Sequence, residues 1–261
     1  MKNLIFLWSR NFLSRSYEKL LAFLLIFLFA FPVLANGFPD ADKDGVPDKD
    51  EIEIYQTNPD NRDTDGDGLS DWVELNKGYS PHNPKPVKLK DNDFDQDGLK
   101  DNMELKFHTS IINPDTDGDG HKDGEEVRNG YDPLTNHNSK LPKKIEVNTA
   151  KQELYYYLGR VKMGTFKVSS GKATTPTPKG SFAIVNKTSR AWSPYGLWMP
   201  YWMGLYNGSF GLHELPYWPN GYREGQSHLG IPVSHGCIRL GIGDAKTLYE
   251  WAPVGTPVLI Y

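Results

Sequence analysis

Three patterns of hydrophobic and polar positions follow one another along the chain of 261 residues. Residues 20–34 are an uninterrupted apolar run behind a basic leader. Between residues 36 and 140 apolar positions are sparse and are separated by acidic stretches. From residue 145 onward, alternating and β-branched or aromatic positions dominate. The pattern therefore predicts an N-terminal segment, a polar module and a C-terminal β domain.

Residues 1–35 have the character of an export signal. The basic leader is followed by the apolar run, and Val33-Leu34-Ala35 resembles a small-residue cleavage site before Asn36. The run is shorter than the ~20 residues that a membrane-spanning helix needs, and Pro32 lies within it. An uncleaved N-terminal anchor is the alternative. In both cases we expect residues 36–261 to be exported, to the periplasm or to the cell wall and extracellular space.

The sequence of the C-terminal module, residues 145–261, predicts a mostly β domain that is large enough for its own hydrophobic core. Strands are expected at residues 145–148, 153–158, 161–169, 180–185 and 256–261. One helix is expected at residues 244–251, because Ala245, Leu248 and Trp251 fall on one helical face.

The polar module, residues 36–138, contains four copies of the pattern D-x-D-x-D-G-x-x-D-x-x-E. The carboxylates of the four copies are Asp40, Asp42, Asp44, Asp48 and Glu51; Asp63, Asp65, Asp67, Asp71 and Glu74; Asp93, Asp95, Asp97, Asp101 and Glu104; and Asp115, Asp117, Asp119, Asp123 and Glu126. Loops with carboxylates at this spacing supply the oxygen ligands that Ca²⁺ prefers. The pattern predicts that all twenty are metal ligands, with Ca²⁺ in a structural role. A solvated acidic linker is the alternative.

Short spacings separate these loops. The ten or eleven residues between one loop and its pair partner leave room for one short helix, not for the two helices of a full EF-hand. This spacing and the DTDGDG strings resemble bacterial thrombospondin type 3 repeats. The resemblance implies a spacer stiffened by calcium, followed by a linker at residues 139–144.

Charge divides between the two modules. Residues 36–140 hold 26 acidic and 12 basic residues, whereas residues 141–261 hold 6 acidic and 13 basic residues. The two modules are therefore expected to have different functions. We expect no nucleic-acid partner, and membrane contact only through the N-terminal segment if it is uncleaved.

The single cysteine of the chain lies in Ser234-His235-Gly236-Cys237-Ile238-Arg239-Leu240. It has no second cysteine to pair with, so it is either an inert buried residue or a reactive thiol. Ser234, His235 and Arg239 place donors and positive charge near the sulfur, and such surroundings favour the thiolate. Gly236 permits a close backbone approach or a positive φ. The pattern favours a nucleophile.

The C-terminal module resembles the catalytic domain of L,D-transpeptidases of the YkuD type over residues 144–261. The matching motifs are Ser170-Gly171, Thr177-Pro178-x-Gly180-x-Phe182, Gly211-Leu212-His213 and the string from Leu229 to Leu240. The resemblance implies a β-sandwich, Cys237 as nucleophile, His213 as general base, and an oxyanion hole formed by backbone amides near Gly236 and Cys237. No cofactor is implied for catalysis.

Three further assignments follow. His235 is expected to orient the site, whereas His228 is a weaker candidate for the base. Arg239 either holds a loop or neutralises a substrate carboxylate. His213 is followed by Glu214 where the family pattern has glycine. Aromatic residues before the cysteine either pack the core or line a cleft: Trp192, Tyr195, Trp198, Tyr201, Trp202, Tyr206, Tyr217, Trp218 and Tyr222.

By this resemblance the chain is a peptidoglycan L,D-transpeptidase that takes a stem tetrapeptide as donor and transfers its acyl group to an amine. The acceptor would be another stem peptide or a wall-linked protein. Two alternatives stay open: an L,D-carboxypeptidase of the same fold, and a calcium-dependent adhesion protein with an inactive β domain.

Overall fold

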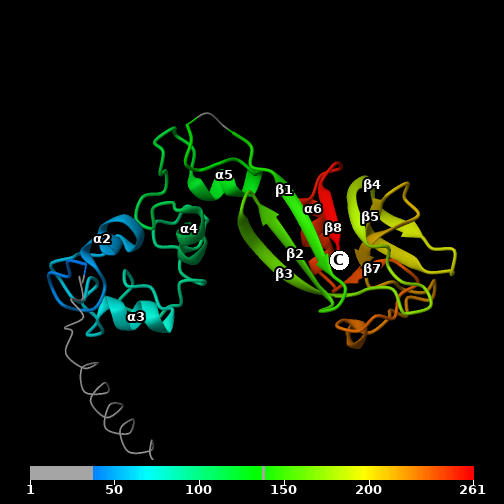
Figure 1. Cartoon of the computed structure of the whole chain (residues 1–261), viewed down its shortest axis with the longest axis horizontal. Helices are drawn as coiled ribbons and strands as arrows, with labels where there is room; N and C mark the ends of the chain where they lie inside the picture. Colours follow the sequence, from blue (N-terminus) through cyan, green and yellow to red (C-terminus); the bar gives the residue numbers. More distant parts are fainter. Residues whose placement is uncertain (1–37, 137–138) are drawn as a thin grey trace, which may run out of the picture.

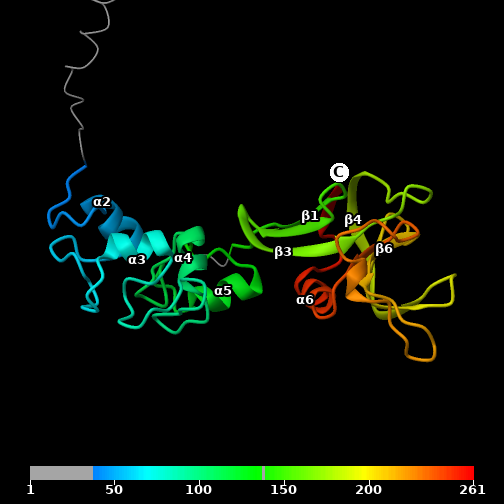
Figure 2. The same ribbon diagram turned by 90° about the horizontal axis from the view of Figure 1, so that it is seen from below.

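The computed structural model describes residues 38–136 and 139–261. The expected export signal at residues 1–35 lies outside the described residues. Within the described ranges, every helix is too short or too polar to cross a membrane. The repeats lie at one end of the molecule and the β domain at the other, in both views (Figures 1 and 2).

In the repeat module, each acidic loop is followed by one short helix, as the spacing predicts. The helices are α2 (Asp48–Asp50) continuing into η1 (Glu51–Tyr55), α3 (Asp71–Lys77), α4 (Asp101–Phe107) and α5 (Asp123–Asn129). The glycine at the sixth position of every loop has a positive φ, between 93° and 109°. A side chain is disfavoured in that backbone conformation, so glycine makes the turn possible.

The loops are joined in pairs by carboxylates that cap the partner loop's helix. Asp44 Oδ2 accepts a hydrogen bond from the Trp72 amide at 2.9 Å, and Asp97 Oδ2 accepts one from the Gly124 amide at 2.5 Å. A Cβ at Gly124 would lie 2.6 Å from the Leu99 amide nitrogen. The second pair therefore needs glycine at this position to pack as closely as it does.

The C-terminal module is a mostly β domain, as predicted. Its strands are β1 (Lys143–Asn148), β2 (Glu153–Leu158), β3 (Val161–Ser169), β4 (Gly180–Trp192), β5 (Trp198–Leu205), β6 (Phe210–Glu214), β7 (Ile238–Leu240) and β8 (Pro257–Ile260). Hydrogen bonding runs in the closed order β1-β2-β3-β7-β6-β5-β4-β8. Because β3 and β4 take part in both constituent sheets, the two packed sheets close into a barrel.

Alternation along the strands fills the barrel interior. Ile145 and Val147 are 1% and 0% exposed, whereas the intervening Glu146 faces outward. Helix α6 (Asp244–Trp251) buries Ala245 and Leu248 against the barrel, on the face that the sequence predicts. Strand β6 pairs with β7 in parallel, with His213 opposite Arg239. This pairing brings the predicted base and the cysteine-bearing motif to adjacent strands.

Four strands depart from the sequence-based expectation. Strand β4 continues to Trp192, seven residues beyond the expected end; residues 180–183 pair with β8 and residues 184–192 with β5. Strands β5, β6 and β7 were not predicted. β5 carries Pro200 and an aromatic run without clean alternation, and β6 and β7 are only 5 and 3 residues long. Periodicity is a weak signal in such segments.

Candidate active site

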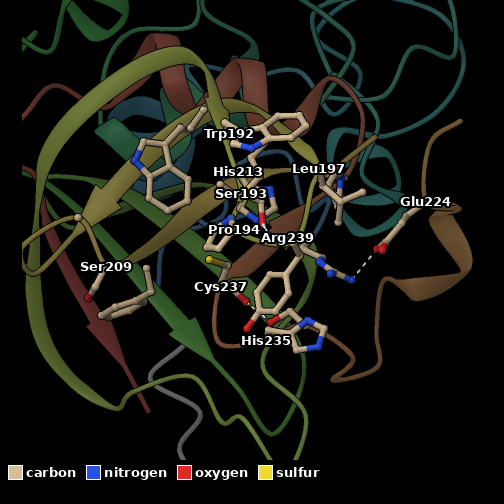
Figure 3. A pocket seen from close by; sticks show the side chains of 18 of the residues that line it. Trp192, Ser193, Pro194, Leu197, Ser209, His213, Glu224, His235, Cys237 and Arg239 are labelled. Atoms are coloured by element: carbon tan, nitrogen blue, oxygen red, sulfur yellow. Dashed lines mark hydrogen bonds and ion pairs between the residues drawn. The ribbon is translucent and has the colours of Figure 1, made fainter. Parts of the chain in front are cut away.

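The cysteine motif opens into a cleft of about 790 Å³ (Figure 3). Four predicted site residues and the predicted base line it: Ser234, His235, Cys237, Arg239 and His213. Gly236 shapes the turn between them. His228 is absent from the cleft wall; it lies in η2 (Gln226–His228) and its Nδ1 atom is 3.2 Å from Glu224 Oε2.

The turn from Ser234 to Cys237 is held by the buried Ser234 hydroxyl. Ser234 Oγ donates to the Cys237 carbonyl oxygen at 2.5 Å and accepts from the Gly236 amide at 3.1 Å. Gly236 has φ 115°, where a side chain would be strained. In this structure the Gly236 amide is engaged by Ser234, and the expected oxyanion hole near Gly236 and Cys237 stays a prediction. The adjacent Cys237 amide is the candidate donor that Ser234 does not engage.

His213 is buried in β6 and held in one tautomer. Its Nδ1 atom lies 2.6 Å from the carbonyl oxygen of Glu214. An Nδ1–H that donates to this carbonyl leaves Nε2 unprotonated and able to accept a proton. Burial lowers the pKa of His213 to about 4, so the ring is neutral at neutral pH. The geometry therefore suits a general base.

Cys237 is half-buried at the cleft wall. Burial raises the pKa of the thiol, against two opposing influences: the Gly211 amide, which donates to the sulfur, and the nearby Arg239 charge. A Cβ at Gly211 would lie 2.3 Å from the Met203 carbonyl oxygen, so only glycine fits beside the sulfur. The resting site thus holds a thiol and a neutral imidazole, with donors placed to support a thiolate as it forms.

His235 lines the cleft with an exposed side chain. Its ring stacks on Tyr195 with centroids 4.4 Å apart, and its Nε2 atom accepts a hydrogen bond from Lys172 Nζ at 3.2 Å. Desolvation and the charges of Lys172 and Arg239 lower the pKa of His235. The contacts of the ring are with Tyr195 and Lys172, and the orienting role of His235 stays a prediction.

Two ion pairs at the cleft were not predicted from the sequence. Arg239 Nη1 lies 2.6 Å from Glu224 Oε2, and Arg223 Nη1 pairs with Glu214 Oε1. Glu224 and Arg223 lie in the segment between β6 and β7, for which the sequence predicted no strand and no functional motif. The adjacent opposite charges of Arg223-Glu224 were the available signal.

Of the nine aromatic residues before the cysteine, only some line the cleft: Trp192, Tyr195, Trp202 and Trp218. Trp192 and Tyr195 are 52% and 57% exposed, which is high for residues that only pack a core. Trp198 instead stacks under Arg190, whose guanidinium carbon lies 4.0 Å from the ring centroid. Tyr201 packs against the buried core of the barrel, so both predicted readings of the cluster apply, each to different residues.

In the repeat module, the carboxylates at positions 1, 3 and 5 of every loop converge. Within each loop their oxygens lie within 4.8 Å of one another, in four groups: Asp40, Asp42 and Asp44; Asp63, Asp65 and Asp67; Asp93, Asp95 and Asp97; and Asp115, Asp117 and Asp119. The glutamates at position 12 are buried, and both carboxylate oxygens of Glu104 and Glu126 have no hydrogen-bond partner. Buried unpaired carboxylate oxygens facing other carboxylates fit a hard cation.

The aspartates at position 9 do not join these groups: Asp48, Asp71, Asp101 and Asp123. Each accepts a hydrogen bond from the backbone amide at position 2 of its own loop, as Asp48 does from Ala41 at 2.7 Å and Asp71 from Thr64 at 2.9 Å. Asp101 and Asp123 do the same with Phe94 and Thr116. Each of the four therefore braces its own loop, and direct ligation of an ion by them stays a prediction.

Comparison with known protein families gives a match to each module. The model described as the L,D-transpeptidase catalytic domain matches residues 142–260. The model described as the bacterial TSP3 repeat matches residues 63–78 and 115–136, which cover the second and fourth loops.

Similar proteins and structures carry the same family name. YkuD from Bacillus subtilis is 31% identical over 129 residues, which are 49% of this chain and 69% of that protein. YkuD from Bacillus licheniformis is 32% identical over 46% of this chain and 66% of that protein. An L,D-transpeptidase structure from Stackebrandtia nassauensis is 28% identical with a TM-score of 0.40, covering 47% of this chain and 57% of that one. The chain therefore spans about two thirds or less of the length of these relatives.

Proposed function

Because the chain belongs to the L,D-transpeptidase family of the YkuD type, we propose that it transfers acyl groups between peptidoglycan stem peptides through Cys237. The observation that carries this proposal is the pairing of one thiol with one neutral imidazole of fixed tautomer in a single cleft. A nucleophile and an oriented base are the minimum that acyl transfer requires.

In the first half of the reaction, His213 Nε2 takes the thiol proton as Cys237 Sγ attacks the carbonyl before the terminal D-residue of a donor tetrapeptide. The Cys237 amide is placed to stabilise the oxyanion of the tetrahedral intermediate. The C–N bond then breaks, the proton on His213 passes to the departing amine, and a thioester remains on the cysteine.

In the second half, the amine of an acceptor stem or of a wall-linked partner attacks the thioester. His213 accepts the amine proton, the C–S bond breaks, and the sulfur regains a proton. The exposed aromatic rings at the cleft rim, Trp192 and Tyr195, offer surface for the stem or its glycan. Water as the acceptor would instead make the enzyme a carboxypeptidase.

We further propose that the four loops bind Ca²⁺ in a structural role. Positions 1, 3, 5 and 12 of each loop would hold the ion. In a carboxylate cluster of this density, bound cations offset the mutual repulsion of the charges and so stiffen the module. The match of two repeats to the bacterial TSP3 family supports this role.

An exported location is part of the same proposal. The apolar N-terminal run behind a basic leader supports it. Fractionation of cells that produce the tagged protein tests it: recovery of the protein in the cytoplasmic fraction alone would contradict export.

The activity is tested by incubating the purified protein with tetrapeptide muropeptides and identifying products by mass spectrometry, beside Cys237→Ala. Cross-linked dimers that depend on Cys237 are the expected result. Tripeptides without dimers would show a carboxypeptidase. No product in either sample, together with a thiol inert to iodoacetamide, would favour the adhesion alternative.

A further inference from the structure

The guanidinium of Arg239 is the charged group of the cleft whose role the proposed reaction leaves unassigned. It lies on β7 two residues after Cys237, its side chain is 8% exposed, and it lines the same cavity. A buried arginine beside a nucleophile would ordinarily be read as the receptor for a substrate carboxylate, because guanidinium binds carboxylates in a bidentate fork.

Glu224 of the same chain already forms an ion pair with the Arg239 guanidinium, where a substrate carboxylate would otherwise bind. Figure 3 shows the ion pair between Glu224 and Arg239 as a dashed line. Glu224 Oε2 is 2.6 Å from Arg239 Nη1, and the Glu224 side chain is only 18% exposed. The same carboxylate oxygen also lies 3.2 Å from His228 Nδ1. Glu224 therefore compensates the charge of Arg239 with a carboxylate that belongs to the cleft wall itself.

The segment carrying Glu224 is fastened at a second point. The neighbouring Arg223 pairs with Glu214, whose other oxygen accepts the Gly243 amide at 3.2 Å. The Glu224 amide also donates to the Pro216 carbonyl at 3.0 Å. Glu214 follows the base His213 directly, so the two ion pairs attach one segment to both strands of the catalytic motif. This anchoring holds Glu224 on Arg239 rather than leaving it to swing into solvent.

We propose that Glu224 is a specificity-determining residue: by neutralising Arg239, it makes the cleft wall beside Cys237 accept an uncharged part of the substrate and disfavour a carboxylate. The inference rests on the proposed function in taking Cys237 as the nucleophile. It adds that the stem-peptide group packed against Arg239 carries no free negative charge. Lys172 is a separate cation, which contacts His235 Nε2 at 3.2 Å.

The charge of the cleft wall beside Cys237 is tested by comparing how fast two alkylating reagents of different charge react with the thiol. Cys237 is the only thiol of the chain, so all labelling reports on this site. In each case the sulfur displaces iodide and forms one C–S bond, but iodoacetate carries a carboxylate and iodoacetamide does not. The measurement is the ratio of the two alkylation rate constants, iodoacetate over iodoacetamide, at one pH and low salt.

Glu224→Gln is expected to raise this ratio about fivefold, because it leaves the Arg239 charge uncompensated beside the sulfur. Glu250→Gln is the matched control: it changes the net charge equally, but Glu250 lies on α6 with a side chain 65% exposed and is expected to leave the ratio unchanged. Arg239→Met, which leaves Glu224 without its partner, is expected to lower the ratio below that of the unchanged protein.

A ratio for Glu224→Gln equal to that of the unchanged protein, or an equal rise in Glu250→Gln, would overturn the proposal. If Glu224→Gln does not fold, Arg239→Met decides: an unchanged or raised ratio sinks the proposal. The readout needs a reactive thiol but no peptide transfer. Absence of dimers from muropeptides would therefore sink the proposed function while leaving this test intact.

Discussion

Phe107 at the end of helix α4 and Leu158 at the end of strand β2 lie in one buried cluster, although they belong to different modules. Val127 of α5 and Trp251 of α6 join the same cluster. The repeats are thus packed against the catalytic domain through apolar side chains, not merely tethered to it. Because α4 and α5 follow the third and fourth acidic loops directly, we expect a change in the conformation of those loops to affect this contact.

Leu158→Ala is predicted to reduce the free energy of unfolding by about 2–5 kcal/mol, since Leu158 is fully buried and the cavity would not refill. Leu259→Ala is the control, because Leu259 is 42% exposed on the short strand β8. Urea denaturation measures both. Equal losses in the two variants would show that the contact between modules contributes nothing of its own.

Calcium removal is predicted to loosen strands β2 and β3 as well as the repeats. Hydrogen exchange with and without a chelator measures this, with faster exchange expected at residues 153–169 after chelation. Glu104→Gln should produce the same effect in the presence of calcium, because its helix contacts the β domain. Glu51→Gln, in the first loop, should deprotect only the repeats. Identical behaviour of both variants would contradict the coupling.

His213→Gln is predicted to slow acylation of Cys237 by about 10²–10⁴-fold, the usual contribution of a general base. Single-turnover acylation by a tetrapeptide donor measures it, with His121→Gln, an exposed histidine of the fourth loop, as control. If His228→Gln lost as much activity as His213→Gln, the base would be misassigned.

The thiol is predicted to titrate above the ordinary cysteine range. Burial raises the pKa of Cys237, and burial lowers that of His213 to about 4, so the two do not form an ion pair in the resting enzyme. Without substrate, iodoacetamide labelling should therefore still be rising with pH at about 8.5, the pKa of free cysteine. A plateau of fast labelling from pH 5 to 8 would indicate a thiolate–imidazolium pair instead.

Patterns in the sequence predicted the parts of the fold that depend on residues close together in the chain. Alternation at Ile145 and Val147 marked β1, and the single helical face of residues 244–251 marked α6. The loop pattern located the carboxylates at positions 1, 3, 5 and 12. The cysteine motif and His213, named through the family resemblance, meet in one cleft.

The choice of hydrogen-bond and ion-pair partners could not be predicted. The pattern treats Asp71 like Asp65, but only the structure shows that Asp71 accepts the Thr64 amide and hydroxyl of its own loop. Likewise, nothing in the sequence pairs Glu224 with Arg239, because the partner is chosen by how the segment between β6 and β7 folds back.

The central claim, that Cys237 carries the acyl group, is tested most directly by intact-mass analysis of the protein quenched in acid during reaction with a tetrapeptide donor. The account predicts a population heavier by the donor minus its terminal D-residue, located on Cys237 by peptide mapping and absent from Cys237→Ala. Cross-linked product formed by Cys237→Ala, or an adduct mapped to another residue, would contradict it.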